Sequence, residues 1–247
     1  MKESYSPIFE IDDEIIELVS TVIKKLDTYK IHLRKKNIHL RKKNRIMSLQ
    51  STLAIENNSL SLKQVTDIIN GKKVLGKVNE IQEVKNIYKA YENIIKYNPY
   101  DIKDFLKAHS YITSSLVSQS GVFRRNDVGI YDGHGNVVHM GARPQYINDE
   151  VNRLFKWLKE SNTHPIIKSC IFHFEIEFIH PFEDGNGRIG RLWQTVILNS
   201  YNKVFEYLPI ETVIYNNQKK YYDVLSYCSK NNNSTKFIKF MLIKTEL

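Results

Sequence analysis

Hydrophobic residues recur every three or four positions along most of this chain, which is the spacing of one face of an α-helix. Near the start, one such face carries Ile15, Val19, Val22, Ile23 and Leu26. The same spacing predicts further helices over residues 45–56, 62–70, 80–96, 101–117, 149–159 and 165–179. The pattern therefore predicts a mainly α-helical protein.

Local signals fix the ends of two of these helices. Ser61 and Gln64 have the spacing of a capping box, in which each side chain bonds the backbone N–H of the other residue. Gly71 ends that helix, and Asn57 with Asn58 can end the preceding one. Glycine and asparagine suit these places because they tolerate the left-handed conformation of a helix C-cap.

One segment has the pattern of β-structure. Residues 128–131 and 136–139 read as two short strands, and Asp132-Gly133-His134-Gly135 between them is typical of a tight turn. Because an isolated hairpin is only marginally stable, we expect it to lie on the helical body. The expected fold class is therefore mainly α, with one small β-hairpin.

Composition favours one soluble domain. Of the 247 residues, 42% are hydrophobic, and no linker rich in proline, glycine or serine divides the chain. No apolar run approaches the roughly 18 residues of a membrane span, and the N-terminus lacks the apolar segment of a signal peptide. We therefore expect a single cytoplasmic domain over residues 1–247 with no membrane partner. Cys170 and Cys228 are expected to be reduced thiols.

The chain is basic, with 36 Lys and Arg residues against 27 Asp and Glu residues and a net charge of +9. This excess fits nucleic acid, anionic lipid or phosphate-bearing small molecules alike. Part of it comes from a duplicated heptad, Ile-His-Leu-Arg-Lys-Lys-Asn, at residues 31–37 and 38–44. Without the second Arg-Lys-Lys triplet the charge would be 9 − 3 = +6. We interpret the repeat as a solvated helix or connection rather than a nucleic-acid-binding arm.

The residues with chemical potential concentrate in segment 180–191, which follows the most apolar predicted helix. Gly185 and Gly187 flank Asn186 just before a new helix, so backbone N–H groups can converge on one anion. Arg188 and Arg191 are three positions apart, and guanidinium groups match phosphate oxygens. The segment predicts a phosphate-binding nest.

Two further side chains of the segment add reactivity. Asp184 is a hard carboxylate suited to Mg²⁺ held jointly with phosphates, and His180 can take up a proton near neutral pH. A plain turn would not require these partners. A calcium loop would need glycine and glutamate where Ile189 and Thr195 stand, and the Gly-Lys-Ser/Thr of a P-loop is absent. The segment therefore predicts chemistry on nucleotide phosphates.

Residues 180–191 resemble the signature of Fic-domain proteins, His-x-Phe-x-Asp/Glu-Gly-Asn-Gly-Arg-x-x-Arg, at every fixed position. The hairpin is similar to the family's flap, and residues 217–225 are similar to its closing helices. The resemblance implies a Fic core over residues 76–247 and an N-terminal helical region over residues 1–75. It also implies that the flap aligns a segment of the target protein as an added strand.

Most characterised Fic proteins transfer AMP from ATP to a hydroxyl side chain of a target protein. The resemblance therefore implies a nucleotidyltransferase that AMPylates Tyr, Thr or Ser residues, with ATP as co-substrate and Mg²⁺ as cofactor. His180 would be the general base for the target hydroxyl, and Asp184 would hold Mg²⁺ against the α- and β-phosphates. The remaining signature residues would form the anion hole (Gly185, Asn186 and Gly187) and grip the β- and γ-phosphates (Arg188 and Arg191).

Residues 52–57 match the inhibitory pattern Ser/Thr-x-x-x-Glu-Gly/Asn of many Fic proteins. By that resemblance, the region 1–75 carries an inhibitory helix in which Thr52 and Glu56 are regulatory. Glu56 would pair with Arg191 and keep the γ-phosphate from binding productively. The alternative to this regulatory role is that Glu56 is a surface glutamate near a helix end.

Three alternatives to simple AMP transfer stay open. Some relatives with this inhibitory pattern remove AMP from modified targets, so the chain can be bifunctional or mainly de-AMPylating. A basic nucleic-acid-binding regulator is a second reading, motivated by the net charge and the repeat. A scaffold with a dead site is the third, although no signature position is lost. The sequence leaves open which nucleotide is the donor and whether the chain forms a homodimer, as relatives often do. It also leaves open the target protein, which can be the chain itself.

Overall fold

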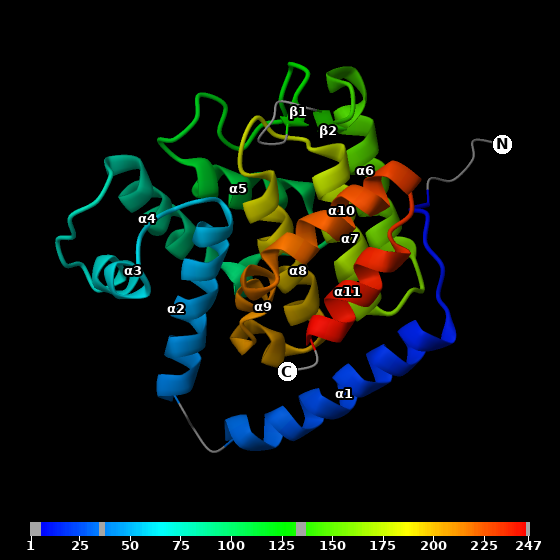
Figure 1. Ribbon diagram of the computed structural model, residues 1–247, viewed down its shortest axis with the longest axis horizontal. Coiled ribbons are helices and arrows are strands. Elements are labelled where there is room, and N and C mark those ends of the chain that lie inside the picture. Colours follow the sequence, from blue (N-terminus) through cyan, green and yellow to red (C-terminus); the bar gives the residue numbers. More distant parts are fainter. Residues whose placement is uncertain (1–5, 35–37, 132–136, 246–247) are drawn as a thin grey trace.

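The computed structural model describes residues 6–34, 38–131 and 137–245. These residues form eleven α-helices, two 3₁₀ turns and one two-stranded sheet (Figure 1). The prediction of a mainly α fold with one small hairpin is confirmed. In chain order the elements are α1 (Asp13–Arg34), α2 (Ile38–Ile55), α3 (Leu62–Ile69), α4 (Val78–Glu92), η1 (Ile94–Lys96), α5 (Ile102–Thr113), β1 (Gly129–Tyr131), β2 (Val137–Met140), α6 (Pro144–Glu160), α7 (Pro165–Ile179), α8 (Asn186–Tyr201), η2 (Lys203–Tyr207), α9 (Ile210–Asn216), α10 (Gln218–Asn231) and α11 (Thr235–Thr245).

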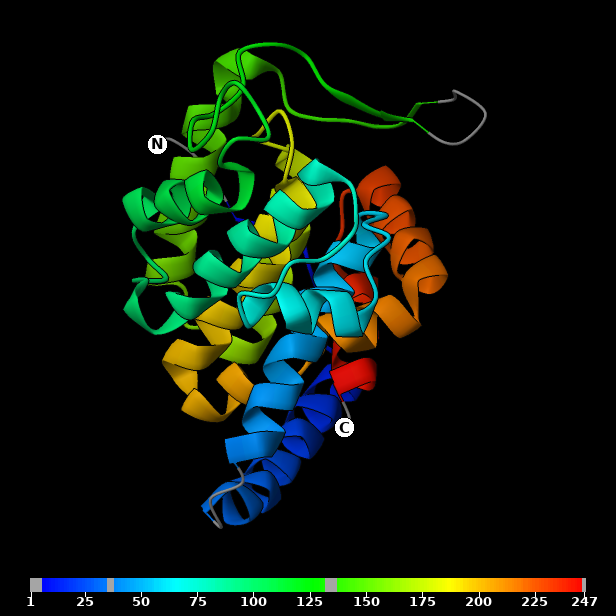
Figure 2. The same ribbon diagram turned by 90° about the vertical axis from the view of Figure 1, so that its left-hand side faces the viewer.

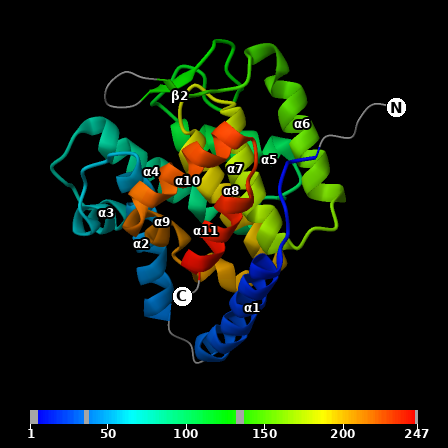
Figure 3. The same ribbon diagram turned by 45° about the vertical axis from the view of Figure 1, so that its right-hand side comes forward.

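Helices α7 and α8 form the centre of the molecule (Figure 1). α7 is apolar on nearly every side, and its residues are buried without a break from Ile166 to Ile176. A helix of this composition must be covered on all faces. α6 and α11 pack on α7, α5 packs on α8, and α1 packs on α11 (Figures 1 and 3).

Aromatic rings fasten the end of α7 to its neighbours. The ring of Phe105, on α5, lies 5.1 Å from that of Trp193, on α8, and 5.6 Å from that of Phe182, which follows α7. Phe155 and Phe172 complete the cluster. Such buried rings contribute large apolar areas and favour fixed relative orientations, so the segment after α7 has a rigid support.

Helix α2 packs against α9 on one side and against α3 and α4 on the other (Figures 1 and 2). It is followed by Asn57 in the left-handed conformation, with φ 65°, as the sequence predicted. The amide of Gln218, on α10, donates a hydrogen bond of 3.0 Å to the carbonyl of Ile55. The last turn of α2 is thereby held close to the body of the molecule.

Several predicted boundaries differ from the structure. α2 begins at Ile38 instead of residue 45, so the two heptads lie on different helices, and residues 35–37 of the first copy lie outside the described residues. α6 begins at Pro144 instead of residue 149, because proline suits the first turn of a helix. The predicted helix 80–96 is divided into α4 and η1, and the predicted helix 101–117 ends at Thr113. The capping box at Ser61 is confirmed.

Contrary to the expectation that it lies on the helical body, the hairpin projects from that body (Figure 2), although β2 contacts α10. Its strands are antiparallel, with Gly129 opposite Met140 and Ile130 opposite His139, and the register shifts after Ile130. The predicted turn residues 132–135 lie outside the part of the chain that the structure describes.

None of the helices in the described ranges is both long and apolar enough to cross a membrane. Cys170 and Cys228 are buried free thiols, in agreement with the prediction of reduced cysteines.

Candidate active site

Two left-handed residues build the turn between α7 and α8. His180 caps the end of α7 with φ 51° and ψ 61°, and Gly185 precedes α8 with φ 83°. A non-glycine residue in this conformation is uncommon, so the surrounding contacts must hold His180 in place. The turn brings His180 and the first turn of α8 to the same end of the central helix pair.

The side chain of Asn186 closes the turn on itself. Its Oδ1 accepts the N–H of Phe182 at 2.9 Å, and its Nδ2 donates to the carbonyl of Phe182 at 2.9 Å. The side chain is therefore committed to the loop backbone. What Asn186 can offer an anion is its main-chain N–H, in the first turn of α8, where N–H groups have no partner within the helix.

Asp184 lies at the mouth of this turn. One carboxylate oxygen accepts the N–H of Gly185 at 2.6 Å, and the other accepts a hydrogen bond from Arg188 at 2.8 Å. Partial burial would raise the pKa of Asp184, but Arg188 and the Gly185 N–H outweigh it and hold that pKa below its ordinary value. Asp184 is therefore a carboxylate at neutral pH.

Arg188 is almost fully buried beneath the turn. Besides Asp184, its guanidinium faces Glu83 of α4, with 3.5 Å between Nη1 and Oε1. Within the described residues, its Nε and Nη1 have no hydrogen-bond acceptor. A buried cation with unused donors is well suited to an added anion.

Arg191 is the second buried arginine, and α2 provides its partners. Its Nε donates to the hydroxyl of Thr52 at 2.9 Å, and its Nη2 donates to a carboxylate oxygen of Glu56 at 2.5 Å. Burial alone would lower the pKa of Arg191, but the Glu56 carboxylate outweighs it and raises the pKa above its ordinary value. The sequence-predicted pairing of Glu56 with Arg191 is present in the structure.

Gly187 makes the approach of Glu56 possible. A Cβ at this position would lie 2.5 Å from Glu56 Oε1 and 3.0 Å from Arg191 Nη1. Any larger residue would therefore collide with the end of the Glu56 side chain. The missing side chain leaves room above the first turn of α8, and Glu56 occupies that room.

Sequence reasoning missed His109, a residue of α5. Its ring stacks on Phe182 with 3.6 Å between centroids, and its Nε2 lies 2.9 Å from the carbonyl of Asp184. Its Nδ1 accepts the N–H of Gly121 at 3.1 Å, so Nε2 carries the proton. Burial lowers the pKa of His109 to about 4. A neutral imidazole therefore supports the turn from below.

A buried cluster behind Arg191 was also missed. The predicted core histidine, His173, is confirmed: Nδ1 lies 2.7 Å from Gln194 and Nε2 lies 3.0 Å from the hydroxyl of Tyr221. The same hydroxyl donates to Glu177 at 3.2 Å. Burial would raise the pKa of Glu177, but His173 and Arg191 lower it below its ordinary value, so Arg191 faces a second carboxylate.

Arg124 joins the base of the hairpin to the turn. Its guanidinium donates to three carbonyls: that of His180 at 2.7 Å, that of Asn126 at 2.6 Å and that of Ala142 at 2.5 Å. Its own N–H donates to Pro181, and the N–H of Ala142 donates to Ile179. One buried side chain thus fixes both ends of the flap to the backbone of His180.

Comparison with known proteins shows which protein family has this geometry. The model of the Fic/DOC family matches residues 99–198, which include the turn and both arginines. The crystal structure of a Fic family protein from Desulfovibrio desulfuricans G20 superposes with a TM-score of 0.94 at 42% identity, covering 98% of this chain and 74% of that one. The chain belongs to the Fic family. The Fic-1 structure from C. elegans shares the fold, with a TM-score of 0.76 at 22% identity over 94% of this chain and 69% of that one.

The curated relatives of this Fic chain are longer proteins. Protein adenylyltransferase Fic of Aedes aegypti is 28% identical over 212 residues, which are 81% of this chain and 40% of that protein. Protein adenylyltransferase fic-1 of Caenorhabditis elegans is 30% identical over 173 residues, 65% of this chain and 33% of that protein. The chain therefore spans less than half the length of these relatives.

The turn between α7 and α8 offers a metal ion only a partial set of ligands. No group of three or more His, Cys, Asp or Glu side chains in the described residues could hold a metal. At the mouth of the turn Asp184 presents a carboxylate, and its side chain is 52% exposed. This donor set fits Mg²⁺, which takes one or two carboxylates and completes its octahedron with phosphate oxygens and water.

The burial of neutral His109 predicts acid sensitivity. Above pH 6.5 the imidazole is neutral in the folded and unfolded states. As the pH falls toward 4, His109 becomes protonated in the unfolded chain but stays neutral in the folded protein, so the free energy of unfolding decreases across this window. Urea unfolding should show that wild type loses about 2–3 kcal/mol more than His109→Gln between pH 7 and pH 4.5. Equal losses in both proteins would contradict this role.

The contacts of Arg124 predict that Arg124→Lys loosens the flap base. An ammonium group cannot bridge three carbonyls in the fixed fork of a guanidinium. Hydrogen exchange should become on the order of tenfold faster at the amides of residues 124 and 142, while α11 is unchanged. The neighbouring exposed residue provides a matched control, since Arg125→Lys should leave both amides protected. Unchanged exchange in Arg124→Lys would show that the clamp is dispensable.

Proposed function

We propose that this chain is a Fic-type protein adenylyltransferase, which transfers AMP from ATP to a Tyr, Thr or Ser hydroxyl of a target protein and is autoinhibited by Glu56. One observation carries the proposal. Arg188 and Arg191 are buried near the N-terminus of α8, and His180 and Asp184 lie in the turn that directly precedes this helix. The adenylyltransferase names of the relatives from Aedes aegypti and Caenorhabditis elegans support it.

Each residue has a role in this reaction. The target hydroxyl oxygen bonds to the α-phosphorus of ATP, the bond to the β-phosphate oxygen breaks, and pyrophosphate leaves. His180 accepts the hydroxyl proton as general base. The N–H groups of residues 186–188 and the side chains of Arg188 and Arg191 bind the phosphates and stabilise the developing negative charge.

The proposed cofactor is Mg²⁺, held by Asp184. Bound there, the ion would neutralise charge on the α- and β-phosphates. The salt bridge between Asp184 and Arg188 is one that bound nucleotide can replace, because phosphate offers Arg188 other oxygens.

The proposed brake is a competition for Arg191. The guanidinium is 1% exposed, and Glu56 Oε1 already lies at the distance a phosphate oxygen would take. Glu56 itself is 32% exposed at the side-chain level, so it can leave toward solvent without carrying a charge through the core. Its departure leaves Arg191 without a main counterion until a phosphate binds, which links release of the brake to nucleotide binding.

A second candidate activity is removal of AMP from modified targets. It is favoured by the position of Glu56, whose carboxylate lies within the site, above Gly187. A carboxylate there can orient a water molecule toward the α-phosphorus of a bound AMP group. In that activity Glu56 would be required, whereas in AMP transfer it inhibits.

Glu56→Gly should therefore activate AMP transfer. Incubated with Mg²⁺ and α-labelled ATP, the variant should label itself or lysate proteins on the order of 10- to 100-fold faster than wild type, because the carboxylate that competes with phosphate for Arg191 is removed. Glu17→Gly changes an exposed glutamate on α1 in the same way and should leave labelling at the wild-type level. A folded Glu56→Gly protein that binds ATP yet gives no label dependent on His180 would refute AMP transfer.

The labelled product separates the two activities without knowledge of the native target. After labelled ATP is removed, wild type added in trans releases labelled AMP if the chain is de-AMPylating, and Glu56→Gly does not. Release by both proteins, or by neither, would leave Glu56 with the inhibitory role alone.

A further inference from the structure

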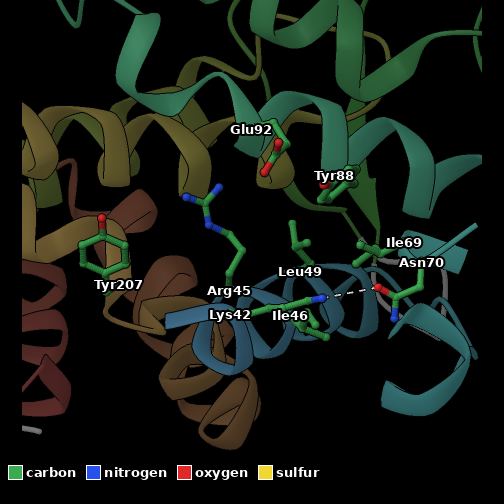
Figure 4. Close-up of a pocket in the computed structure, with 9 residues that line it drawn as sticks. All are labelled: Lys42, Arg45, Ile46, Leu49, Ile69, Asn70, Tyr88, Glu92 and Tyr207. Carbon is green, nitrogen blue, oxygen red and sulfur yellow. Dashed lines mark hydrogen bonds between the residues drawn. The ribbon is translucent and has the colours of Figure 1, made fainter. Parts of the chain in front are cut away.

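A cavity lies at the end of α2 opposite to Glu56. It has a volume of about 360 Å³ and is lined by nine residues from α2, α3 and its C-cap residue Asn70, α4 and η2 (Figure 4). This is within the range of small-molecule sites in proteins. The proposed adenylylation reaction uses none of these nine residues.

The lining combines an apolar floor with charged groups. Ile46 and Leu49 of α2 form the floor and are almost fully buried, and Ile69 of α3 adds a third aliphatic side chain. Lys42 and Glu92 lie around this floor (Figure 4). A ligand that uses both features needs an apolar body and one charged group.

The two cations of the lining differ in what they can bind. Arg45 donates to the carbonyl of Tyr91 at 2.7 Å and to Glu206 at 2.6 Å, so its charge is already compensated. Lys42 is exposed, and its ammonium group donates to the amide oxygen of Asn70 at 3.4 Å (Figure 4). An ammonium ion with such a weak neutral partner is ready for an anion. Lys42 belongs to the second copy of the duplicated heptad, which the reaction leaves without a role.

Helix α2 connects the cavity to Glu56. The lining residues Lys42, Arg45 and Leu49 share one face of α2 with Thr52, at helical spacings of three and four, and Glu56 directly follows the last residue of this helix. The distance from Leu49 to Glu56 along the helix is seven residues, or about 10 Å. Movement of this segment as a rigid helix would therefore displace both the lining of the cavity and Glu56.

A second connection runs through Tyr91, whose carbonyl accepts the hydrogen bond from Arg45. The phenol of Tyr91 donates to buried Glu211 at 2.8 Å. Glu211 in turn accepts the hydroxyl of Thr195 at 3.3 Å, on the same helix as Arg191. Side chains with this degree of burial and pairing can transmit a displacement.

We propose that this cavity is an effector site for a small organic anion with an aromatic or aliphatic body, bound through Lys42 and the floor of α2, and that its occupation strengthens the Glu56 brake. The site itself is independent of the reaction, whereas its regulatory effect rests on the proposed function.

The cavity is present in the conformation in which Glu56 pairs with Arg191. A ligand shifts an equilibrium only through different affinities for the two states. The proposed direction is that an anion bridging α2 to α3 and α4 binds this conformation more tightly than one from which Glu56 has left. By linkage, nucleotide and effector must weaken each other's binding by the same factor.

The site can be tested with the aromatic sulfonate 8-anilinonaphthalene-1-sulfonate as the probe, followed by fluorescence. Lys42→Gln should weaken its binding about three- to fivefold, and Glu92→Gln should tighten it by a similar factor, because the two changes remove opposite charges from one cavity. Lys73→Gln, in the neighbouring groove formed by residues 68–75 with α4, is the matched control and should bind as wild type does. Equal affinity of Lys42→Gln and Lys73→Gln would overturn the site.

The coupling can be tested by binding alone. Glu56→Gly should bind the probe about threefold more weakly than wild type, and saturating probe should weaken ATP binding to wild type by a like factor while leaving Glu56→Gly unaffected. Identical probe affinity in wild type and Glu56→Gly would overturn the regulatory effect. A chain that transfers no AMP would still show the Lys42 and Glu92 effects, so failure of the proposed function is distinguishable from failure of the site.

Discussion

The buried guanidinium of Arg191 is the constraint on which the site depends. A cationic side chain that is 1% exposed is costly to leave without a counterion, because its desolvation is then not compensated. In this structure Glu56 supplies that charge from α2, and Glu177 adds a second carboxylate from α7. In the proposed reaction a phosphate takes the place of Glu56. Inhibition and substrate binding are then two ways of satisfying one charge.

The remainder of the site is built to stay fixed. Asn186 closes the turn, His109 supports it from α5, and Arg124 ties the flap base to the carbonyl of His180. Such contacts reduce the reorganisation needed when a substrate binds. The end of α2 is also held, since buried Asn58 donates to Glu83 at 2.7 Å and Glu83 faces Arg188. The Glu56 side chain, which is 32% exposed, is therefore the group expected to move when a phosphate binds Arg191.

Local patterns predicted what depends on neighbours in the chain. The helices, the capping box at Ser61 and the left-handed Asn57 all follow from spacings of at most four residues. The boundaries at residues 45, 101–117 and 149 were less accurate, because tertiary packing extends or shortens a helix beyond its strongest periodicity. His109 and Glu177 gave no signal, since their partners lie at distant positions or on another helix.

The sequence by itself determined the chemical groups of the turn and their order, because residues 180–191 are contiguous and their spacing sets which groups can meet. It also determined that Glu56 lies close to the end of a helix. Only the tertiary structure decided that this carboxylate reaches Arg191, 135 positions away. It also decided that the Asn186 side chain bonds the loop backbone and that α2 lines a cavity together with α3 and α4. The physical reason is that burial and long-range pairing arise from packing, which no local spacing encodes.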